Sequence, residues 1–262
     1  MSLKMLKHAI YSIKPLPPVK ICYLIQSEEN EIAFNENKPL RSASIIKLFI
    51  LAAAYYEEEK ENIDLSKQVH LSPSDMVGGA GVIPYLSDKQ NYTYQQLLEL
   101  MIIVSDNTAT NALIDFIGLD TIHAFIQQIG GKHTKLERKL MDDAAIKLGL
   151  ENRTSCYDVM LLLDLLTEPN NVLPKHRQEQ MLTILKNQQF NSKLTAFSAY
   201  DSSIKTFHKT GELTGAEHDA AIFQTADKQL KAVMLTEGWT NNGEGQQFHQ
   251  RAGAHIYHYL KG

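Results

Sequence analysis

The sequence predicts an α+β protein, with an antiparallel sheet formed from both termini, flanking helices and an inserted all-helical domain. Strand-like segments lie near the N-terminus and again after about residue 190, and apolar segments of helical character fill the middle of the chain. Strands from both ends of a chain can bury their apolar faces economically in one shared sheet. The predicted boundaries are 1–40 with 192–262 for the sheet domain and 41–191 for the helical domain.

The N-terminal segment predicts a helix followed by a hairpin. The first residues form a short amphipathic pattern, which the prolines at positions 15, 17 and 18 end. Residues 19–25 have strand character, and residues 31–34 are the expected hairpin partner, joined through a polar turn at 28–30.

The middle of the chain predicts a series of helices. Its first helical segment is almost entirely apolar apart from Ser44 and Lys47, and a helix that is apolar all round is a buried one. Gly118 closes one expected helix, and Ser155 is the expected N-cap of another, which Pro169 terminates. The expected helices are 44–56, 95–104, 108–117, 120–129, 155–166 and 174–187.

Short strands are predicted in the C-terminal part. They are expected at 204–208, 218–224 and 230–235, because turn residues that include Gly211 and Gly215 separate them. A closing helix is expected at 246–260. The glycine-rich segment 78–81 is interpreted as a flexible surface turn.

Composition and charge exclude several classes of protein. The formal net charge of −4 and the scattered basic residues give no support to binding of nucleic acid or of an anionic membrane. No stretch approaches the length of a membrane span, and no apolar run of leader length follows the first residues. We therefore expect a cytosolic protein or one whose leader has been removed. Cys22 and Cys156 are too few for a disulfide framework and are expected to be small buried hydrophobes.

The first candidate catalytic string holds Ser44 and Lys47. On a helix, positions i and i+3 share a face, so the amine can approach the hydroxyl. Burial and nearby cations lower a lysine pKa, which lets a neutral amine accept the serine proton. At the start of a helix, the N–H of Ser44 can also face a developing oxyanion. A second Ser-x-x-Lys string, Ser202 to Lys205, is expected in a strand, where its ends point to opposite faces.

The second string is Ser105, Asp106 and Asn107, which directly follows an apolar helical segment. All three residue types are good helix caps, which is one interpretation of the string. The other makes Ser105 a proton shuttle toward a leaving nitrogen and gives Asn107 a hydrogen bond to a substrate amide. Asp106 would then hold the loop.

The third string is Lys209, Thr210 and Gly211, expected at the end of a strand just before a turn. It is either an exposed strand end with a turn glycine or a binding site. In the second interpretation, Lys209 and Thr210 bind the carboxylate of an anionic substrate, and Gly211 lets that substrate lie close to the strand backbone. The N–H of Glu212 would be a second oxyanion donor.

Together and in this order, the three strings resemble those of the serine β-lactamase and penicillin-binding protein family. The resemblance runs from about residue 19 to the C-terminus. The separations of 61 residues from Ser44 to Ser105 and 104 residues from Ser105 to Lys209 are similar to class A spacing. The stretch 105–111 is an especially close match, and the predicted sheet with its helical insert also resembles the family fold. The active site is then expected at the interface of the two domains.

The resemblance implies a serine hydrolase that opens β-lactam amides through an acyl-enzyme on Ser44, like a class A β-lactamase. In this interpretation Lys47 is the leading base, Ser105 and Lys209 relay protons or bind substrate, and Asn107 and Thr210 orient it. The resemblance implies a monomer that needs no cofactor or metal and acts on a small β-lactam or peptide.

One residue of the family pattern is missing. Class A enzymes carry a glutamate, between the second and third strings, that activates the water releasing the acyl group. With Arg138 as the anchor, this position falls on Leu140, which cannot activate water. Asp142 or Asp143 could substitute if the loop is shifted, or both could be solvated loop residues.

The missing glutamate leaves open a penicillin-binding D,D-peptidase-like hydrolase with slow deacylation. A sensor of β-lactams or peptidoglycan peptides, using the same pocket, is a third hypothesis. A metalloenzyme has less support, because the histidines show no His-Glu-x-x-His pattern, and His255 with His258 fits a partly exposed helix face. The glycines at 78–81 are not followed by Lys-Ser or Lys-Thr, so they are not a phosphate loop.

Overall fold

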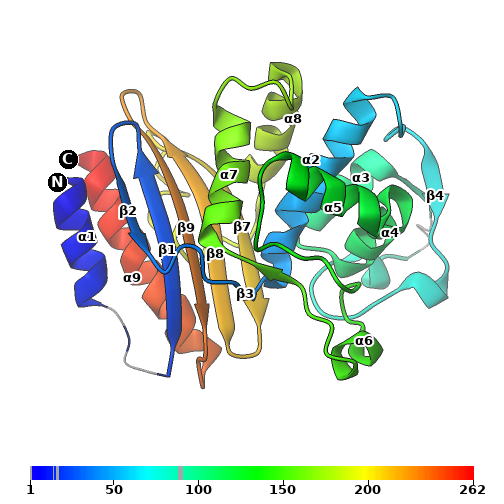
Figure 1. Cartoon of the computed structure of the whole chain (residues 1–262), viewed down its shortest axis with the longest axis horizontal. Coiled ribbons are helices and arrows are strands. Elements are labelled where there is room, and N and C mark those ends of the chain that lie inside the picture. Colours follow the sequence, from blue (N-terminus) through cyan, green and yellow to red (C-terminus); the bar gives the residue numbers. More distant parts are fainter. Residues whose placement is uncertain (1, 14, 16–17, 88–90) are drawn as a thin grey trace.

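The computed structural model describes residues 2–13, 15, 18–87 and 91–262. Pro17, one of the three prolines predicted to end the first helix, lies outside these residues. The fold is the predicted α+β arrangement: an antiparallel sheet with helices on both faces and further helices beyond one of them (Figure 1). Both termini lie at the same end of the molecule.

The main sheet has five strands in the order β2-β1-β9-β8-β7, and all neighbours are antiparallel. The hydrogen bonds between β1 and β9 join the two ends of the chain, with Tyr23 opposite Met234. This pairing confirms that the sheet is built from both termini. The strands are β1 (Lys20–Ser27), β2 (Glu31–Phe34), β7 (Lys205–Leu213), β8 (Ala216–Gln224) and β9 (Gln229–Glu237).

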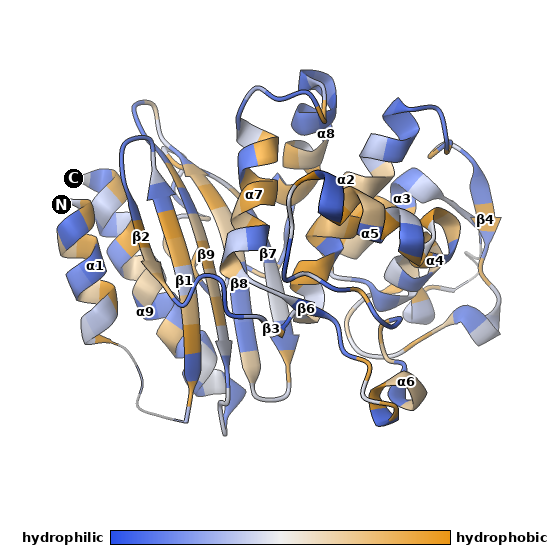
Figure 2. Ribbon diagram, in the orientation of Figure 1, coloured by the Kyte–Doolittle hydropathy of each residue, from blue (hydrophilic) through white to orange (hydrophobic). Residues whose placement is uncertain are grey.

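Alternation along the strands divides the apolar core into two parts. In β1, Tyr23 and Ile25 belong to the core beneath α1 and α9, whereas Cys22 and Leu24 face the other helices. Successive side chains of a strand point to opposite faces, and a sheet covered on both faces therefore needs apolar residues at nearly every position. Figure 2 shows β1 as apolar along most of its length. Both cysteines are buried and free, as expected.

Helices α1 (Leu3–Ser12) and α9 (Asn242–Lys261) cover one face of the sheet, and α7 (Cys156–Thr167) and α8 (Lys175–Lys186) lie toward the other (Figure 1). The expected caps are present: the Ser155 hydroxyl accepts the Asp158 N–H at 3.1 Å, and Gly118, with φ of 89°, ends the helix Asn107–Ile117. Farther from the sheet lie α2 (Ile46–Glu59), α3 (Tyr94–Ile103), α4 (Asn107–Ile117) and α5 (Leu119–Gln128).

The structure corrects two strand predictions. Strand β7 continues to Leu213, so the third string lies within the strand and not at its end. Ser202 and Ser203 lie in a turn before β7, and only Lys205 of the second Ser-x-x-Lys string is in the strand. Several short elements were not predicted, because two to five residues carry too little periodicity. They are β3 (Leu40–Arg41), β4 (Gln68–His70), β5 (Asn91–Thr93), β6 (Arg153–Thr154) and α6 (Asp143–Lys147).

Candidate active site

Ser44 lies in the 3-10 turn η1 (Ala43–Ile45), which leads directly into α2. The residue before it, Ala43, has a positive φ of 46°, a conformation that costs a non-glycine residue about 1–3 kcal/mol. Ile45 and Ala43 are buried, whereas Ser44 is half-buried, so the turn is packed on both sides while the hydroxyl-bearing residue reaches the surface of a cleft.

Lys47 is fully buried on the first turn of α2. Its amine donates to the carbonyl oxygen of Ser105 at 2.6 Å, to the Ser105 hydroxyl at 3.1 Å and to Asn107 Oδ1 at 2.8 Å. Ser44 is not among its hydrogen-bond partners in the described part of the chain. Burial lowers the pKa of Lys47 well below its usual value, and the charge of Lys209 lowers it further. Burial therefore favours the neutral form of an amine that lies one helical turn from Ser44.

The second string joins α3 to α4, and its first two residues differ in what they contact. Asp106 caps α4: its Oδ1 accepts the Ala109 N–H at 3.0 Å, and its Oδ2 accepts the N–H groups of Val82 and Ile83. Ser105 has a positive φ of 56° and is buried. The capping interpretation is thus correct for Asp106, whose position leaves Ser105 free to face Lys47.

The glycine-rich segment 78–81 lies at the surface, as expected, and hydrogen bonds from the second string hold it there. The Asn107 amide donates to the Gly78 carbonyl at 3.0 Å, and the Asn107 N–H donates to the Ala80 carbonyl at 3.0 Å. A Cβ at Gly81 would lie 2.3 Å from Asp106 Oδ2, and φ there is 123°. Only glycine fits such a close approach in this backbone conformation.

Lys209 enters the cleft from β7, the outer strand of the sheet. Its buried amine donates to the Ser105 hydroxyl at 3.1 Å and to the Thr210 carbonyl at 2.8 Å. Burial and then the charge of Lys193 lower the pKa of Lys209 to about 7, against a smaller opposing effect of Asp219. The Ser105 hydroxyl therefore lies between two lysine amines, each 3.1 Å away.

Strand β7 also lies directly against the turn that carries Ser44. A Cβ at Gly211 would lie 3.2 Å from the Cβ of Ala43 and 3.1 Å from a side-chain carbon of Ile45. The glycine thus permits close contact between the strand and the serine turn, a role different from the predicted one of admitting substrate. A hollow of about 420 Å³ opens here, lined by Ser44, Ser105, Thr210, Glu212 and other residues.

A second, more apolar hollow of about 290 Å³ lies on the other side of Ser44, and Asn107 and Leu140 line it. The side chain of Asn111 holds the backbone of Leu140 at both ends: its Oδ1 accepts the Leu140 N–H at 2.8 Å, and its amide donates to the Leu140 carbonyl at 3.0 Å. Asp142 caps α6 through the Ala145 N–H. Asp143 is exposed and also lines this hollow.

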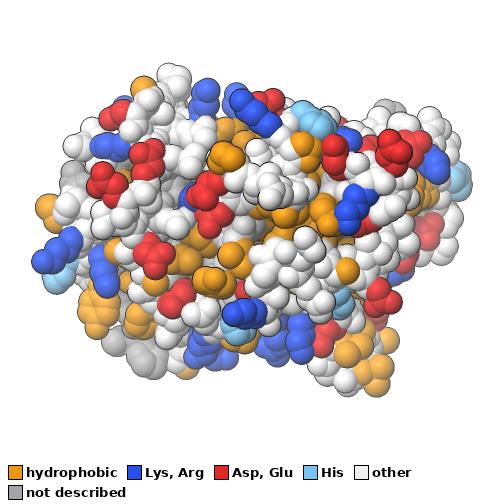
Figure 3. All heavy atoms as spheres, turned by 45° about the horizontal axis from the view of Figure 1, so that its top comes forward, with side chains coloured by type: hydrophobic (Ala, Val, Ile, Leu, Met, Phe, Trp, Pro, Cys, Tyr) orange, Lys and Arg blue, Asp and Glu red, His pale blue; other side chains and the backbone are white. Residues whose placement is uncertain are grey.

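Exposed apolar side chains surround α6, beside this second hollow. Ile146, Leu148 and Met141 are 43%, 80% and 48% exposed, respectively. Figure 3 shows hydrophobic side chains gathered on the projecting corner that α6 forms in Figure 1.

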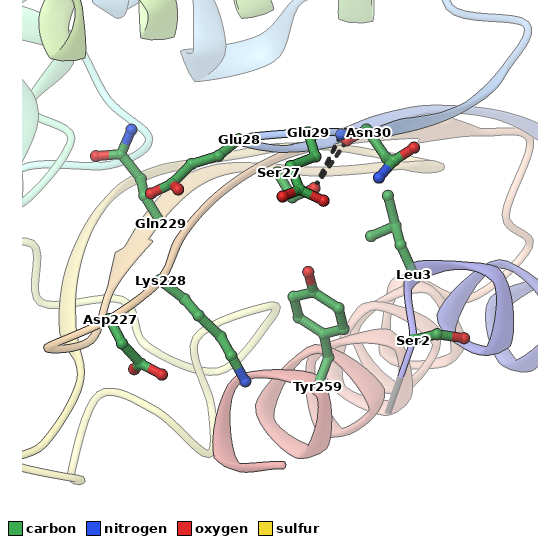
Figure 4. Close-up of a pocket in the computed structure, with 10 residues that line it drawn as sticks. All are labelled: Ser2, Leu3, Ser27, Glu28, Glu29, Asn30, Asp227, Lys228, Gln229 and Tyr259. Carbon is green, nitrogen blue, oxygen red and sulfur yellow. Dashed lines mark hydrogen bonds between the residues drawn. The ribbon is translucent and has the colours of Figure 1, made fainter.

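Figure 4 shows a third hollow, between the β1–β2 turn, the β8–β9 turn and the two terminal helices. Ser27 and Asn30 of the first hairpin, Lys228 of the β8–β9 turn and Tyr259 of α9 line it. None of the predicted site residues does.

Two parts of the site were not found from the sequence. Asn111 belongs to the matched stretch, yet nothing local marks its contact with a residue 29 positions away. Lys193 stands alone in a polar segment, and only the structure shows its buried position beside β7. Among the described residues, no group of three or more His, Cys, Asp or Glu side chains could hold a metal ion. No helix in this part of the chain is long and apolar enough to cross a membrane.

Comparison with known proteins identifies relatives of this fold. The family model described as "Beta-lactamase enzyme family" matches residues 15–260. A β-lactamase of Proteus vulgaris is 28% identical over 169 residues, which are 62% of this chain and 55% of the relative. The β-lactamase BRO-1 of Moraxella catarrhalis is 32% identical over 98 residues, or 37% of this chain and 31% of the relative. The chain thus matches about a third to a half of the length of these two curated relatives.

Solved structures are similar over almost the whole chain. A β-lactamase from Sphaerobacter thermophilus has a TM-score of 0.87 at 25% identity, covering 98% of this chain and 97% of the other. A variant of the protein PBP-A, in which a leucine is replaced by glutamate, is described as an acyl-enzyme complex with penicillin G. It has a TM-score of 0.87 at 21% identity, covering 99% of this chain and 97% of the other. At that identity, the likeness to PBP-A shows a common fold.

Proposed function

This chain belongs to the β-lactamase enzyme family. We propose that it is a serine hydrolase, and that its Ser44 attacks the amide of a β-lactam and becomes acylated. The observation that carries the proposal is the position of the Ser105 hydroxyl between the amines of Lys47 and Lys209. This arrangement links the three strings in one hydrogen-bonded row beside Ser44. Structural lysines are commonly paired with acids, whereas both of these amines have neutral acceptors.

The proposed acylation begins with attack of Ser44 Oγ on the lactam carbonyl carbon. The neutral amine of Lys47 takes the hydroxyl proton, and the N–H groups of Ser44 and Glu212 stabilise the oxyanion. When the C–N bond breaks, Ser105 gives its proton to the leaving nitrogen and regains one from Lys47, so that in net one proton moves from Ser44 to that nitrogen. Lys209 and Thr210 bind the substrate carboxylate, and Asn107 orients the side-chain amide. The product is an ester of Ser44.

A second candidate function is a penicillin-binding, D,D-peptidase-like hydrolase in which this ester persists. One observation favours it: the Leu140 backbone is fixed by Asn111, and its side chain brings no base to the wall beside Ser44. Asp142 is occupied as a helix cap, which leaves exposed Asp143 as the remaining aspartate of this loop. Slow deacylation is therefore the behaviour we propose for the native chain.

Mixing the purified protein with a chromogenic cephalosporin tests both candidates. A burst of one equivalent that then stops supports acylation with slow release, and sustained turnover supports an efficient β-lactamase. If a fluorescent penicillin does not label the protein and the cephalosporin is not hydrolysed either, both candidates are contradicted, and a site that senses some other ligand is favoured.

A further inference from the structure

We propose that Lys193 is a positioning residue, which orients and polarises the peptide group that supplies the Glu212 N–H to the oxyanion. This inference rests on the proposed function, because it concerns the same acylation reaction. Lys193 lies outside the three strings, in the segment between α8 and β7.

The Lys193 amine is buried and lies over the inner edge of β7. It donates to the carbonyl oxygen of Gly211 at 2.8 Å and to that of His218, the residue opposite Gly211 in β8, at 3.3 Å. Its carboxylate partner is Glu217, with Lys193 Nζ 2.5 Å from Glu217 Oε2, and both side chains are at most 3% exposed. The Lys193 amine thus binds one carbonyl of β7 and one carbonyl of β8, although Lys193 itself is not part of the sheet.

The contact with Gly211 reaches the proposed oxyanion donor through a single peptide plane. The carbonyl of Gly211 and the N–H of Glu212 belong to the same trans peptide and point in opposite directions. A bond that holds this carbonyl toward β8 therefore directs the N–H away from β8, toward the free side of the outer strand. The serine turn lies on that strand, because a Cβ at Gly211 would touch Ala43 and Ile45.

A cation on the carbonyl oxygen also strengthens the donor. Polarising a peptide at its oxygen makes its N–H more positive, and hydrogen bonds in a chain reinforce one another in this way. A donor aimed in advance at the developing charge needs no reorganisation during the reaction. Lys193 therefore acts on the oxyanion without touching it.

The position of Lys193 is fixed by the carboxylate of Glu217, which is itself held by α9. Asn242, the first residue of α9, donates to Glu217 Oε1 at 2.6 Å and to the Leu213 carbonyl at 2.9 Å. A Cβ at Gly245 would lie 2.7 Å from the Glu217 side chain, so the helix approaches the carboxylate closely. A buried ion pair is weak evidence for stability, because desolvation offsets the attraction. The contact between Lys193 and the Gly211 carbonyl gives this ion pair a role in the reaction beyond stability.

The competing role for Lys193 is direct binding of the substrate carboxylate, since this lysine also borders the hollow that contains Ser44. The two roles differ in what they change. A carboxylate ligand alters the dissociation constant of substrates that carry a carboxylate. An oxyanion-positioning residue alters the acylation rate constant at saturation, with or without that carboxylate.

The test compares acylation of the native protein and of K193M/E217Q by penicillin G and by its methyl ester. The double variant removes both charges, so that no unpaired carboxylate remains buried. We expect the acylation rate constant to fall about tenfold to hundredfold for both compounds, somewhat less than the loss of an oxyanion donor itself. At pH 6, where the Lys209 amine is protonated with or without the charge of Lys193, both dissociation constants should stay within about threefold of native. In infrared difference spectra, the acyl-ester carbonyl band of the variant should move to higher wavenumber, because its oxygen receives a weaker hydrogen bond.

A matched control is K231M, which removes a lysine that is equally buried in the same sheet but is paired with Asp164 and Glu168 of the α7 region. Its acylation rate constant and carbonyl band should equal those of the native protein. If K193M/E217Q does not fold, K193Q/E217Q keeps polar atoms in the site and should show the same losses.

Native acylation rates in the folded double variant would overturn the role of Lys193. A loss confined to the dissociation constant of penicillin G would overturn it too, in favour of carboxylate binding. If penicillin G does not acylate the native protein, the proposed function fails first, and this role of Lys193 fails with it.

Discussion

The two walls beside Ser44 differ in chemistry. One wall brings the Ser105 hydroxyl and the amines of Lys47 and Lys209 into a single hydrogen-bonded row. The other presents Leu140, whose backbone is held by the side chain of Asn111, and the apolar side chains near α6. The first wall has the groups that the proposed proton transfers use, whereas Leu140 of the second offers no base for a water molecule. From this difference we expect acylation and release of the acyl group to depend on different walls of the site.

The largest expected effect is the loss of the nucleophile. S44A should abolish covalent labelling by a fluorescent penicillin, because no other hydroxyl is proposed to attack the carbonyl. The midpoint of thermal unfolding should change little, since the half-buried hydroxyl has no hydrogen bond to Lys47 in the described residues. Labelling retained in the folded variant would contradict the assignment of Ser44.

Replacing the base weakens the polar wall next. K47M should lower the acylation rate constant, measured by stopped flow, by about 10²–10⁴-fold, because general base catalysis contributes that much. The matched variant K231M should leave that rate unchanged and lower the free energy of unfolding by about 2 kcal/mol, since one of its carboxylate partners is well exposed. Equal acylation rates in K47M and the native protein would rule out Lys47 as the base.

A glutamate at position 140 should give the wall formed by Leu140 the base that it lacks. L140E should shorten the lifetime of the acyl-enzyme by about tenfold or more, because a carboxylate there can activate water. L140Q has the same size without a base and should leave the lifetime as in the native protein. The measurement is the rate at which penicillin-saturated protein regains its reaction with a chromogenic cephalosporin. An equal gain in both variants would attribute the effect to shape and not to a base.

The smallest effect concerns pH. Because the pKa of Lys209 is lowered to about 7 by burial and the charge of Lys193, its amine is protonated below that pH and neutral above it. A bound carboxylate favours the protonated form, so the dissociation constant of penicillin G should rise about tenfold per pH unit at most above pH 7. The constant of the methyl ester should stay flat over the same range. A parallel rise for both compounds would show that Lys209 does not bind the carboxylate.

The polar wall was largely predictable from the sequence, because each of its residues belongs to a short string whose local context fixes its direction. Ser44 and Lys47 share one helical turn, and Lys209 lies on a strand whose alternation turns it toward the helices. Leu140 was found only by resemblance, with Arg138 as the anchor. The prediction that the strings form the catalytic site is tested by the variants above.

What the sequence could not show depends on contacts between distant segments. Asn111 binds the backbone of Leu140, and Lys193 binds the carbonyl of Gly211, and neither contact leaves a local pattern. The segment 78–81 was expected to be a flexible surface turn, and no local pattern shows that Gly81 lies against the carboxylate of Asp106 or Gly79 against the amide of Asn107. Glycine-rich composition predicts where a chain can turn, but it does not show which residues the turn contacts.

Intact-mass spectrometry after one addition of penicillin G, followed over time, tests the central claim most directly. We expect the whole population to gain the mass of one intact penicillin quickly, to keep it over many minutes, and to carry it on the peptide that contains Ser44. Failure of the mass to increase, or an adduct on another residue, would contradict acylation of Ser44. Rapid return to the original mass as free penicillin is consumed would contradict slow release from the wall that Leu140 forms.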